Sequence, residues 1–367
     1  MSKKSIFLIA GARPNFMKIA PLWHAFQGPQ EYEVQIVHTG QHYDYQMSQV
    51  FFEELELPKP HYFLAVGSGS HGEQTGEVLK ATEELFTQNP PDLVIVVGDV
   101  NSTLAAALSA AKLQVMVAHV EAGLRSFDRT MPEEINRVLT DRISDLLLVS
   151  EPSGVDNLGA EGVDLSRVHL VGNLMIDSLK RNLPMIRKRR TAQKLTLKEG
   201  GFGLVTLHRP ANVDNERSLR RAIEILREAA ARLPLVFPAH PRTRKNVSRF
   251  GLDGDMAAIE NLQVIDPLGY FDFVHLMDAS AFVLTDSGGI QEETTWLGVP
   301  CITLRENTER PLTVQTGTNT ITGLEPEKVR SALREAENFN REQYKPPHLW
   351  DGMAAQRVLD RVGQSLQ

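Results

Sequence analysis

The sequence consists of short, continuously apolar runs separated by amphipathic stretches of helical length, and this alternation limits the fold more than any other feature. Continuous runs are typical of strands buried on both faces, and strand–helix alternation predicts parallel sheets with right-handed crossovers. We therefore predict an α/β fold with two doubly wound, Rossmann-like domains. The strand-like runs are Ile6–Ala10, Val34–Val37, Leu93–Val97, Val115–Val120, Leu146–Val149, Gly203–Leu207, Leu235–Pro238, Leu262–Ile265, Phe282–Thr285 and Cys301–Leu304. The helical stretches include Thr103–Ala111, Glu133–Ile143, Ser218–Arg232 and Gly289–Leu297.

A chain of 367 residues is long enough for two domains, each with its own core. The boundary is expected after the strand-like segment 168–171, which gives a first domain over residues 1–172 and a second domain from residue 173. The segment that follows contains the basic run Arg187–Arg190, which we interpret as a solvated helix face rather than a nucleic-acid site, because no aromatic residues are interleaved with it. Two such domains in tandem predict a ligand cleft between their facing strand ends.

Composition excludes several classes of protein. With 39 Lys and Arg against 46 Asp and Glu, the net charge is −7, so we expect neither a nucleic-acid partner nor an anionic membrane surface. The single cysteine, Cys301, excludes an intrachain disulfide and a cysteine-built zinc site. No apolar run approaches the roughly 20 residues of a membrane span, and the N-terminal segment is too short for a secretory signal. We expect a cytoplasmic protein.

Polar residues that follow the first-domain strands are the first site candidates. Gly11 permits a tight turn, and Arg13 and Lys18 bring two cations to a helix N-terminus, which suits an anion; a charged surface loop would carry the same residues. Asp99 follows the strand 93–97, where capping of the next helix is the better interpretation of this residue alone. Glu121 directly ends an apolar strand, where an unpaired charge would be costly to bury.

The segment Pro132–Arg137 suits the first turn of a helix, because it begins with proline and two glutamates. Glu133 and Arg137 are four residues apart and share a helix face, so they form either a site pair or an exposed ion pair.

The second domain carries polar residues at corresponding strand ends. His208 is the first residue past its strand, where an imidazole suits proton transfer, and His240 follows the next strand. Ser287, Gly288 and Gly289 offer backbone N–H groups at a helix start to phosphate oxygens. Glu293 lies one turn into that helix and could accept hydrogen bonds from a ribose diol, whereas Arg310 suits a diphosphate.

Three other patterns are rejected. The glycine-rich segment 67–72 does not open the first strand–helix unit, so it is not a dinucleotide loop. His119 and Glu121 lack a third ligand with useful spacing, and we predict no metal site. A P-loop is absent.

Taken together, these motifs resemble the non-hydrolysing UDP-N-acetylglucosamine 2-epimerase family. The matching segments are GARPNFMK (11–18), GDVNST (98–103), VEAGLRS (120–126), PEEINR (132–137), HR (208–209), TDSGGIQEE (285–293) and TERP (308–311). The resemblance implies the GT-B-like arrangement of two domains facing across a cleft, with residues 350–367 packing back on the first domain, so that the second covers 173–349. It also implies a cytoplasmic homodimer that supplies polysaccharide biosynthesis and needs no cofactor.

The resemblance also assigns roles. Asp99, Glu121, Glu133 and His208 would surround the sugar as catalytic residues, with Arg137 supporting them. His240, at the end of the strand that follows His208 in the sequence, is a further substrate-binding candidate. The residues expected to hold UDP are Arg13, Lys18, Phe273, Ser287, Gly288, Gly289, Glu293 and Arg310. The implied reaction expels UDP from C1 while C2 loses its proton, and UDP then adds back to the resulting 2-acetamidoglucal with C2 protonated from the opposite face.

Some positions depart from the family pattern. Ala12 and Asn15 replace the more frequent Thr and Glu, and Pro210 and Ala211 replace Arg and Glu. Gln41–His42 is family-like, but the departures leave allosteric activation open. They also permit a modified UDP-sugar, such as a 2,3-diacetamido uronic acid, as substrate. The same motifs are compatible with a hydrolysing epimerase, with a GT-B glycosyltransferase and with a catalytically silent nucleotide-sugar sensor.

Overall fold

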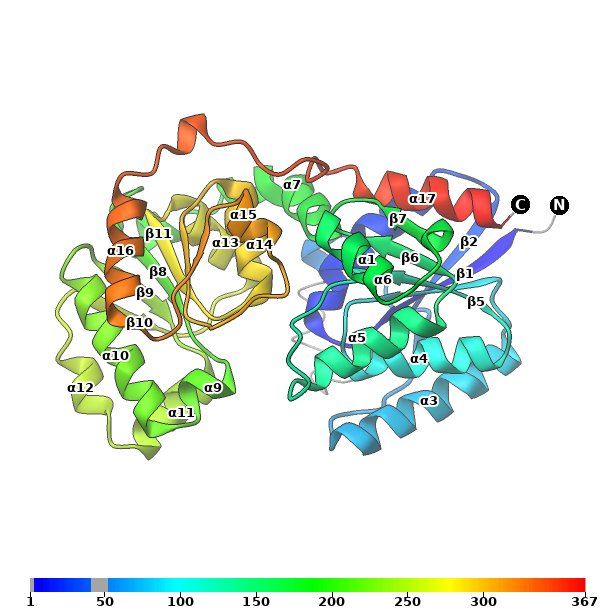
Figure 1. Cartoon of the computed structure of the whole chain (residues 1–367), viewed down its shortest axis with the longest axis horizontal. Coiled ribbons are helices and arrows are strands. Elements are labelled where there is room, and N and C mark those ends of the chain that lie inside the picture. The colour runs from blue at the N-terminus through cyan, green and yellow to red at the C-terminus, as the bar shows by residue number, and fades with distance from the viewer. Residues whose placement is uncertain (1–2, 41–51, 367) are drawn as a thin grey trace. The chain divides into compact units, whose positions relative to one another are not determined.

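The computed structural model describes residues 3–40 and 52–366. The chain forms two compact units (Figure 1). Unit 1 comprises Met1–Arg181 and His348–Gln367, and unit 2 comprises Asn182–Pro347. Each unit has a parallel sheet with helices on both faces, so the predicted doubly wound α/β class is confirmed.

The sheet of unit 1 has seven strands in the order β3-β2-β1-β4-β5-β6-β7, and every neighbouring pair is parallel. Its central strands are fully buried because helices cover both faces, which explains their continuous apolar sequences. The strands are β1 (Lys4–Ala10), β2 (Tyr32–His38), β3 (Tyr62–Phe63), β4 (Leu93–Val97), β5 (Met116–Val120), β6 (Leu146–Val149) and β7 (Val168–Leu170).

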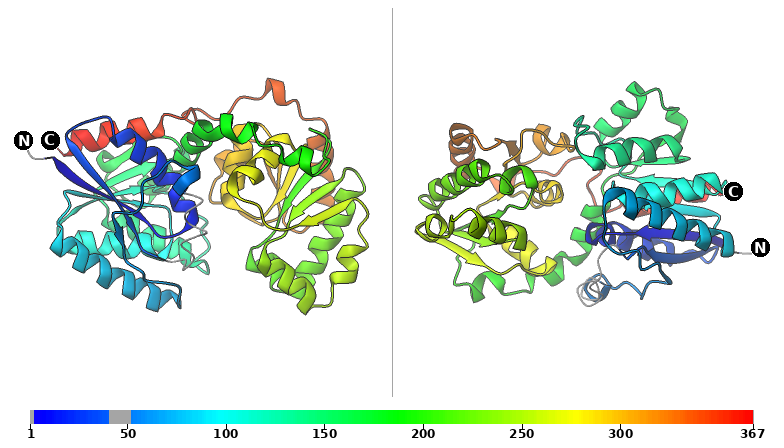
Figure 2. Two further views of the ribbon diagram at one scale, coloured as in Figure 1. Left: turned by 180° about the vertical axis from the view of Figure 1, so that it is seen from behind. Right: turned by 90° about the horizontal axis from the view of Figure 1, so that it is seen from below.

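The helices of unit 1 include the C-terminal helix α17 (Ala354–Ser365), which packs against α1 (Arg13–Phe26) (Figure 2). Trp350, just before α17, is fully buried and donates its indole N–H to the carbonyl oxygen of Ser150 at 3.3 Å. Asp177 accepts the first backbone N–H groups of α17, from Ala354 and Ala355. Further helices are α3 (His71–Gln88), α4 (Asn101–Lys112), α5 (Pro132–Ile143), α6 (Pro152–Ala160) and α7 (Leu174–Arg187), which belongs to unit 2 from Asn182 onward.

The sheet of unit 2 has six parallel strands in the order β10-β9-β8-β11-β12-β13. The strands are β8 (Gly203–Thr206), β9 (Leu235–Pro238), β10 (Leu262–Ile265), β11 (Phe282–Thr285), β12 (Cys301–Thr303) and β13 (Asn319–Ile321).

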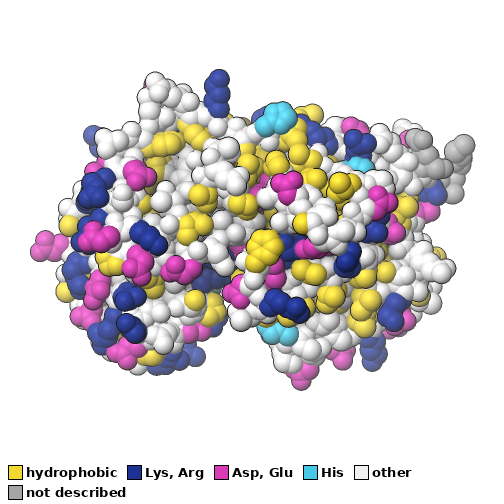
Figure 3. Space-filling view, in the orientation of Figure 1, with side chains coloured by type: hydrophobic (Ala, Val, Ile, Leu, Met, Phe, Trp, Pro, Cys, Tyr) yellow, Lys and Arg dark blue, Asp and Glu magenta, His cyan; other side chains and the backbone are white. Residues whose placement is uncertain are grey.

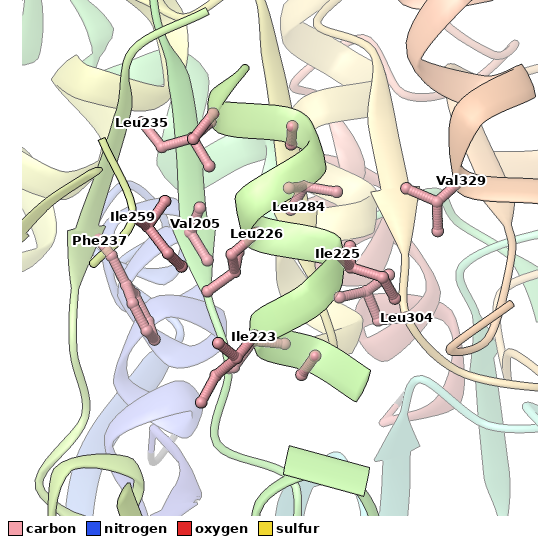
Figure 4. Close-up of a cluster of buried hydrophobic side chains, with 14 of the residues drawn as sticks. Val205, Ile223, Ile225, Leu226, Leu235, Phe237, Ile259, Leu284, Leu304 and Val329 are labelled. Carbon is pink, nitrogen blue, oxygen red and sulfur yellow. The ribbon is translucent and has the colours of Figure 1, made fainter. Parts of the chain in front are cut away.

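One core of unit 2 forms where α10 (Glu216–Ala230) packs on the sheet. Figure 4 shows Ile223 and Leu226 of this helix facing Val205 and Phe237 of the strands. The remaining helices are α8 (Thr191–Lys194), α9 (Pro210–Val213), α11 (Pro241–Arg249), α12 (Asp253–Ala257), α13 (Tyr270–Ala279), α14 (Gly288–Leu297), α15 (Leu312–Gln315) and α16 (Pro326–Glu337).

The ten predicted strands are all present, with ends that differ by at most two residues, but the edge strands β3 and β13 were not predicted. β3 has only two residues, and β13 reads Asn-Thr-Ile, so neither has an apolar run. The basic run Arg187–Arg190, which begins at the last residue of α7, is only partly solvated. Arg187 pairs with Asp278 at 2.8 Å, and Arg189 lies over the ring of Phe271, so the run also anchors this segment to α13.

Basic and acidic side chains are interspersed on the face of the molecule drawn in Figure 3. Within residues 3–40 and 52–366, no helix has the length and apolar character that a membrane crossing requires.

Candidate active site

Each sheet has one point at which the order of its strands reverses, and ligands of doubly wound sheets bind outside the carboxyl ends of the strands at such a point. In unit 1 it lies between β1 and β4, and in unit 2 between β8 and β11. The predicted site residues follow these strands or their neighbours, so each unit carries its own set.

The turn between β1 and α1 is held by Asn15. Its carbonyl oxygen accepts the backbone N–H groups of Gly11 at 3.1 Å and Ala12 at 2.8 Å, and its amide donates to the carbonyl oxygen of Val97 at the end of β4. Asn15, which replaces the family's more frequent glutamate, therefore joins the two strands at the reversal. Arg13 begins α1, but its side chain lies outside the described part, as do Gln41 and His42.

Lys18 and Glu121 form a buried ion pair. The Lys18 Nζ lies 2.6 Å from Glu121 Oε2, and the two side chains are 9% and 4% exposed. Glu121 has a φ of +68°, a left-handed conformation that is unfavourable for a residue with a Cβ and persists only where the surrounding structure enforces it. Its Oε1 is buried and has no hydrogen-bond partner within the described residues. The carboxylate is thus held in place by Lys18, with its second oxygen buried and unpaired within the described residues.

Asp99 pairs with Arg137 of α5. Arg137 Nη2 lies 2.5 Å from Asp99 Oδ2, and its Nη1 lies 2.5 Å from Glu134 Oε2. The N-cap of α4 is Val100 and no side chain caps that helix, so the interpretation of Asp99 as a cap is wrong. Arg137 is almost completely buried, which shows that it is not part of an exposed ion pair. It holds Asp99 at the end of β4.

The two adjacent glutamates of α5 differ in environment. Glu134 is buried and accepts hydrogen bonds from Ser126 and the backbone N–H of Phe127, which fixes the loop before α5. Glu133 is half-buried in the first turn of the same helix. Glu134 was missed by sequence reasoning, although its spacing of three residues from Arg137 is compatible with an ion pair.

His208 and Asp286 meet at the strand reversal of unit 2. Asp286 is fully buried and accepts the backbone N–H groups of His208 and Arg209, and its Oδ1 lies 3.2 Å from His208 Nδ1. Burial acts to raise the pKa of Asp286, but the bonds and charge of His208 hold it below its usual value. An ionised Asp286 orients the imidazole through Nδ1 and leaves Nε2 for a ligand.

His240 lies beside His208, with the ring centroids 5.7 Å apart. Its Nδ1 accepts the backbone N–H of Arg242 at 3.1 Å. Burial lowers the pKa of His240, and the nearby charges of His208 and Arg242 lower it further. A neutral imidazole at this position can both donate and accept hydrogen bonds.

The start of α14 follows Asp286. Ser287 is the N-cap residue but its side chain makes no capping bond, so it leaves the first N–H groups of the helix uncapped. Gly288 allows Arg310 to approach this helix end, because a Cβ there would lie 2.7 Å from Arg310 Nη1. Arg310 is oriented by Glu292, whose Oε2 lies 2.9 Å from Nε. A helix N-terminus and a guanidinium both attract phosphate oxygens, so this end of α14 is a candidate phosphate site.

Glu293 lies in the second turn of α14 and is buried. Tyr270 donates its hydroxyl to Glu293 Oε1 at 2.7 Å. Burial raises the pKa of Glu293 to about 7, although the bond from Tyr270 acts to lower it. Phe273 is half-buried on the same helix as Tyr270.

The structure therefore brings Lys18, Asp99, Glu121 and Arg137 together by direct pairs in unit 1, with Glu133 on the helix that carries Arg137. In unit 2 it pairs His208 with Asp286 and places the α14 N-terminus beside Arg310. Asp286, Tyr270 and Glu292 were not predicted as site residues. The described part of the chain has no cluster of three side chains suited to a metal ion.

Two doubly wound units with a GT-B-like fold, a candidate phosphate site at a helix end and paired carboxylates indicate an enzyme of the nucleotide-sugar class. The sequence profile described as UDP-N-acetylglucosamine 2-epimerase matches residues 24–363. The chain belongs to the UDP-N-acetylglucosamine 2-epimerase family and is an isomerase, as its motifs predicted.

Individual relatives agree with this assignment. The chain is 42% identical to a UDP-N-acetylglucosamine 2-epimerase of Methanocaldococcus jannaschii, over 96% of this chain and 97% of that protein. It is also 42% identical to a UDP-2,3-diacetamido-2,3-dideoxy-D-glucuronate 2-epimerase of Pseudomonas aeruginosa, over 90% of this chain and 91% of that protein. Among solved structures, a complex of the M. jannaschii epimerase with UDP-GlcNAc and UDP matches with a TM-score of 0.89 and 41% identity. The match covers 98% of this chain and 99% of that chain. A glycosyltransferase at 14% identity and a TM-score of 0.56, covering both chains fully, shares the fold.

Proposed function

We propose that this protein interconverts UDP-N-acetylglucosamine and UDP-N-acetylmannosamine by eliminating UDP and adding it back. The observation that carries the proposal is the pairing of charged side chains in unit 1: buried Lys18 with buried Glu121, and buried Arg137 with the partly exposed Asp99. The C2 proton of the sugar has no neighbouring carbonyl group to acidify it. Its removal therefore has to accompany departure of the diphosphate from C1, which requires bases and cations together.

Unit 2 would bind the UDP portion. In this proposal the N–H groups of Ser287, Gly288 and Gly289 and the guanidinium of Arg310 hold the diphosphate, and Glu293 accepts the ribose hydroxyl groups. Phe273 would contact the nucleoside. His208, oriented by Asp286, and His240 would face the sugar and diphosphate.

Unit 1 would carry out the proton transfers. A carboxylate takes the C2 proton while the electron pair of the C2–H bond forms the C1–C2 double bond, and the C1–O bond breaks to release UDP. The reverse step adds UDP to C1, with C2 protonated on the opposite face. We assign proton transfer to Asp99 and Glu133 and stabilisation of positive charge at C1 to Glu121. Lys18 has three donors, so it can hold Glu121 and still bind a phosphate oxygen.

An NMR time course with UDP-N-acetylglucosamine in deuterated buffer tests this function. The proposal requires UDP-N-acetylmannosamine with deuterium at C2 and no accumulation of free UDP. Stoichiometric free N-acetylmannosamine and UDP would instead identify a hydrolysing epimerase. Turnover that begins only after a sugar acceptor is added would identify a glycosyltransferase.

A modified substrate is the second candidate, because the Pseudomonas relative, named for a diacetamido glucuronate, is as similar as the Methanocaldococcus one. Comparing kcat/KM for UDP-N-acetylglucosamine and for UDP-2,3-diacetamido-2,3-dideoxyglucuronate tests it. We expect the higher value for UDP-N-acetylglucosamine, and the reverse order would select the second candidate.

We also propose that the protein is a homodimer, as the family resemblance implies. Light scattering coupled to size-exclusion chromatography should then give twice the chain mass of 40.9 kDa. A single-chain mass at micromolar concentration would contradict this proposal.

A further inference from the structure

The buried side chain of His119 lies behind the candidate site. It extends from β5 and has no exposed surface. Its Nε2 lies 2.8 Å from the carbonyl oxygen of Gly98, and its Nδ1 lies 2.6 Å from Asp141 Oδ1. His119 therefore contacts Gly98, the residue that immediately precedes Asp99. Along the chain, His119 lies two residues before Glu121.

The partners determine which atoms donate. A carbonyl oxygen can only accept, so Nε2 of His119 carries a proton and donates it to Gly98. Burial acts to raise the pKa of Asp141, but His119 and Arg125 hold it below its usual value, so Asp141 is ionised where its Oδ1 meets Nδ1 of His119. Both ring nitrogens are thus engaged by protein atoms, which leaves neither for a metal ion.

Asp141 extends the connection to the loop that follows Glu121. Its second oxygen accepts the backbone N–H of Gly123 at 3.1 Å and lies 2.7 Å from Arg125 Nη1. Arg125 in turn forms a two-pronged pair with Glu161. Asp141 and Arg125 are both buried, and their mutual ion pair offsets the cost of burying each charge.

The pair of His119 and Asp141 joins the three segments that carry the candidate carboxylates. Gly98 leads into Asp99, Gly123 follows Glu121, and Asp141 belongs to α5, the helix of Glu133. Glu121 has a positive φ angle of +68°, which is strained for a residue with a Cβ, so the backbone around it needs such fixed contacts to keep its geometry.

We infer that His119 is a positioning residue for the epimerisation, which fixes the backbone before Asp99 through its bond to the Gly98 carbonyl. This inference rests on the proposed function. His119 does not touch the substrate. Its contribution is to hold the Asp99 carboxylate where the C2 proton is transferred, and misplacement by about 1 Å can cost roughly 100-fold in rate.

Two substitutions separate the two bonds of His119. In His119→Gln the side-chain amide can reach the position of Nε2 and keep the bond to Gly98. In His119→Asn the amide replaces Nδ1, which keeps the bond to Asp141 but leaves the Gly98 carbonyl unpaired. We expect His119→Asn to lower kcat by about 30- to 100-fold and His119→Gln by less than about 5-fold. KM and the Kd for UDP should change less than about 3-fold in both variants.

The matched control is Asp145→Asn. Asp145 accepts the backbone N–H of Val117 at 2.8 Å, at the opposite end of the same strand. This variant should lower the melting temperature with kcat unchanged. Equal losses of kcat in His119→Gln and His119→Asn that follow their melting temperatures would overturn the inference and show a purely structural role. Unchanged kcat in His119→Asn, or a change confined to KM, would also overturn it.

Deuterium incorporation at C2 by the wild-type protein separates this inference from the proposed function. Its absence in the wild type would refute the epimerase function itself. Its presence in the wild type, with equal incorporation rates in His119→Asn, would refute only the role of His119.

Discussion

Replacing Glu293 with Gln should stabilise unit 2 at neutral pH, because the wild-type carboxyl group is buried and, among the described residues, pairs with no cation. Its pKa is raised to about 7 by burial, with the charge of Glu292 adding to the rise, whereas its ordinary value is 4.5. The folded state therefore keeps this proton to higher pH than the unfolded chain does. The stability that the protonated group contributes is complete below pH 4.5 and is lost as the pH rises towards 7.

The magnitude follows from the width of this window. Each pH unit between 4.5 and 7 corresponds to about 1.4 kcal/mol in the free energy of unfolding. Across this window the wild type should therefore lose about 3 kcal/mol of stability that the Glu293→Gln variant retains. Gln keeps the acceptor oxygen for the hydroxyl of Tyr270 and carries no charge, so the packing is preserved.

Urea unfolding followed by circular dichroism between pH 4.5 and 8 measures this difference. The two proteins should have similar free energies of unfolding at pH 4.5, and the variant should be the more stable by about 3 kcal/mol at pH 8. Equal stability at every pH, or a variant that is less stable at pH 8, would refute the reasoning.

Glu309 provides the matched control with the opposite sign. Burial acts to raise its pKa, but the bond from Arg305 and the charges of Arg310 and Arg305 lower it to about 2. The stability that ionised Glu309 contributes is therefore complete above pH 4.5 and is lost as the pH falls towards 2. Glu309→Gln should destabilise the protein at pH 7, because Arg305 is left partly unpaired.

Three further predictions concern binding, catalysis and stability. Gly288→Ala should weaken UDP binding about 10-fold in calorimetry, because its Cβ would displace Arg310 from the helix end, and an unchanged Kd would contradict that role. Arg137→Lys should lower kcat about 100-fold with a smaller change in KM, since a lysine cannot reproduce the forked contacts of Arg137 to Asp99 and Glu134. Full activity of this variant would exclude the positioning role. Trp350→Ala should destabilise unit 1 by about 3–5 kcal/mol in urea unfolding, because a fully buried indole is lost, and a loss below about 1 kcal/mol would show that the C-terminal segment does not stabilise this unit.

Strands of the sheets could be predicted from the sequence because burial on both faces makes them continuously apolar. The same reasoning located Asp99, Glu121 and His208, since the carboxyl ends of parallel strands carry the ligand-binding residues. The short edge strands β3 and β13 lack this pattern and were missed.

Supporting residues could not be predicted, because their partners are distant in sequence. Asp286 meets His208 across 78 residues, and Tyr270 meets Glu293 across 23 residues. For Asp99, capping was the expected role by itself, and only the fold shows that Arg137, 38 residues later, binds its carboxylate instead. Local sequence rules describe neighbours within a turn or a strand, whereas these pairs depend on which strands become adjacent.

The most direct test of the central claim follows the C2 hydrogen of the sugar in Asp99→Asn and Glu133→Gln. Both proteins are incubated with UDP-N-acetylglucosamine in deuterated buffer, and exchange at C2 is measured by NMR against the wild type. If these carboxylates transfer the proton, exchange should fall at least about 100-fold in one or both variants while UDP binding is retained. Near-normal exchange in both variants would contradict the account.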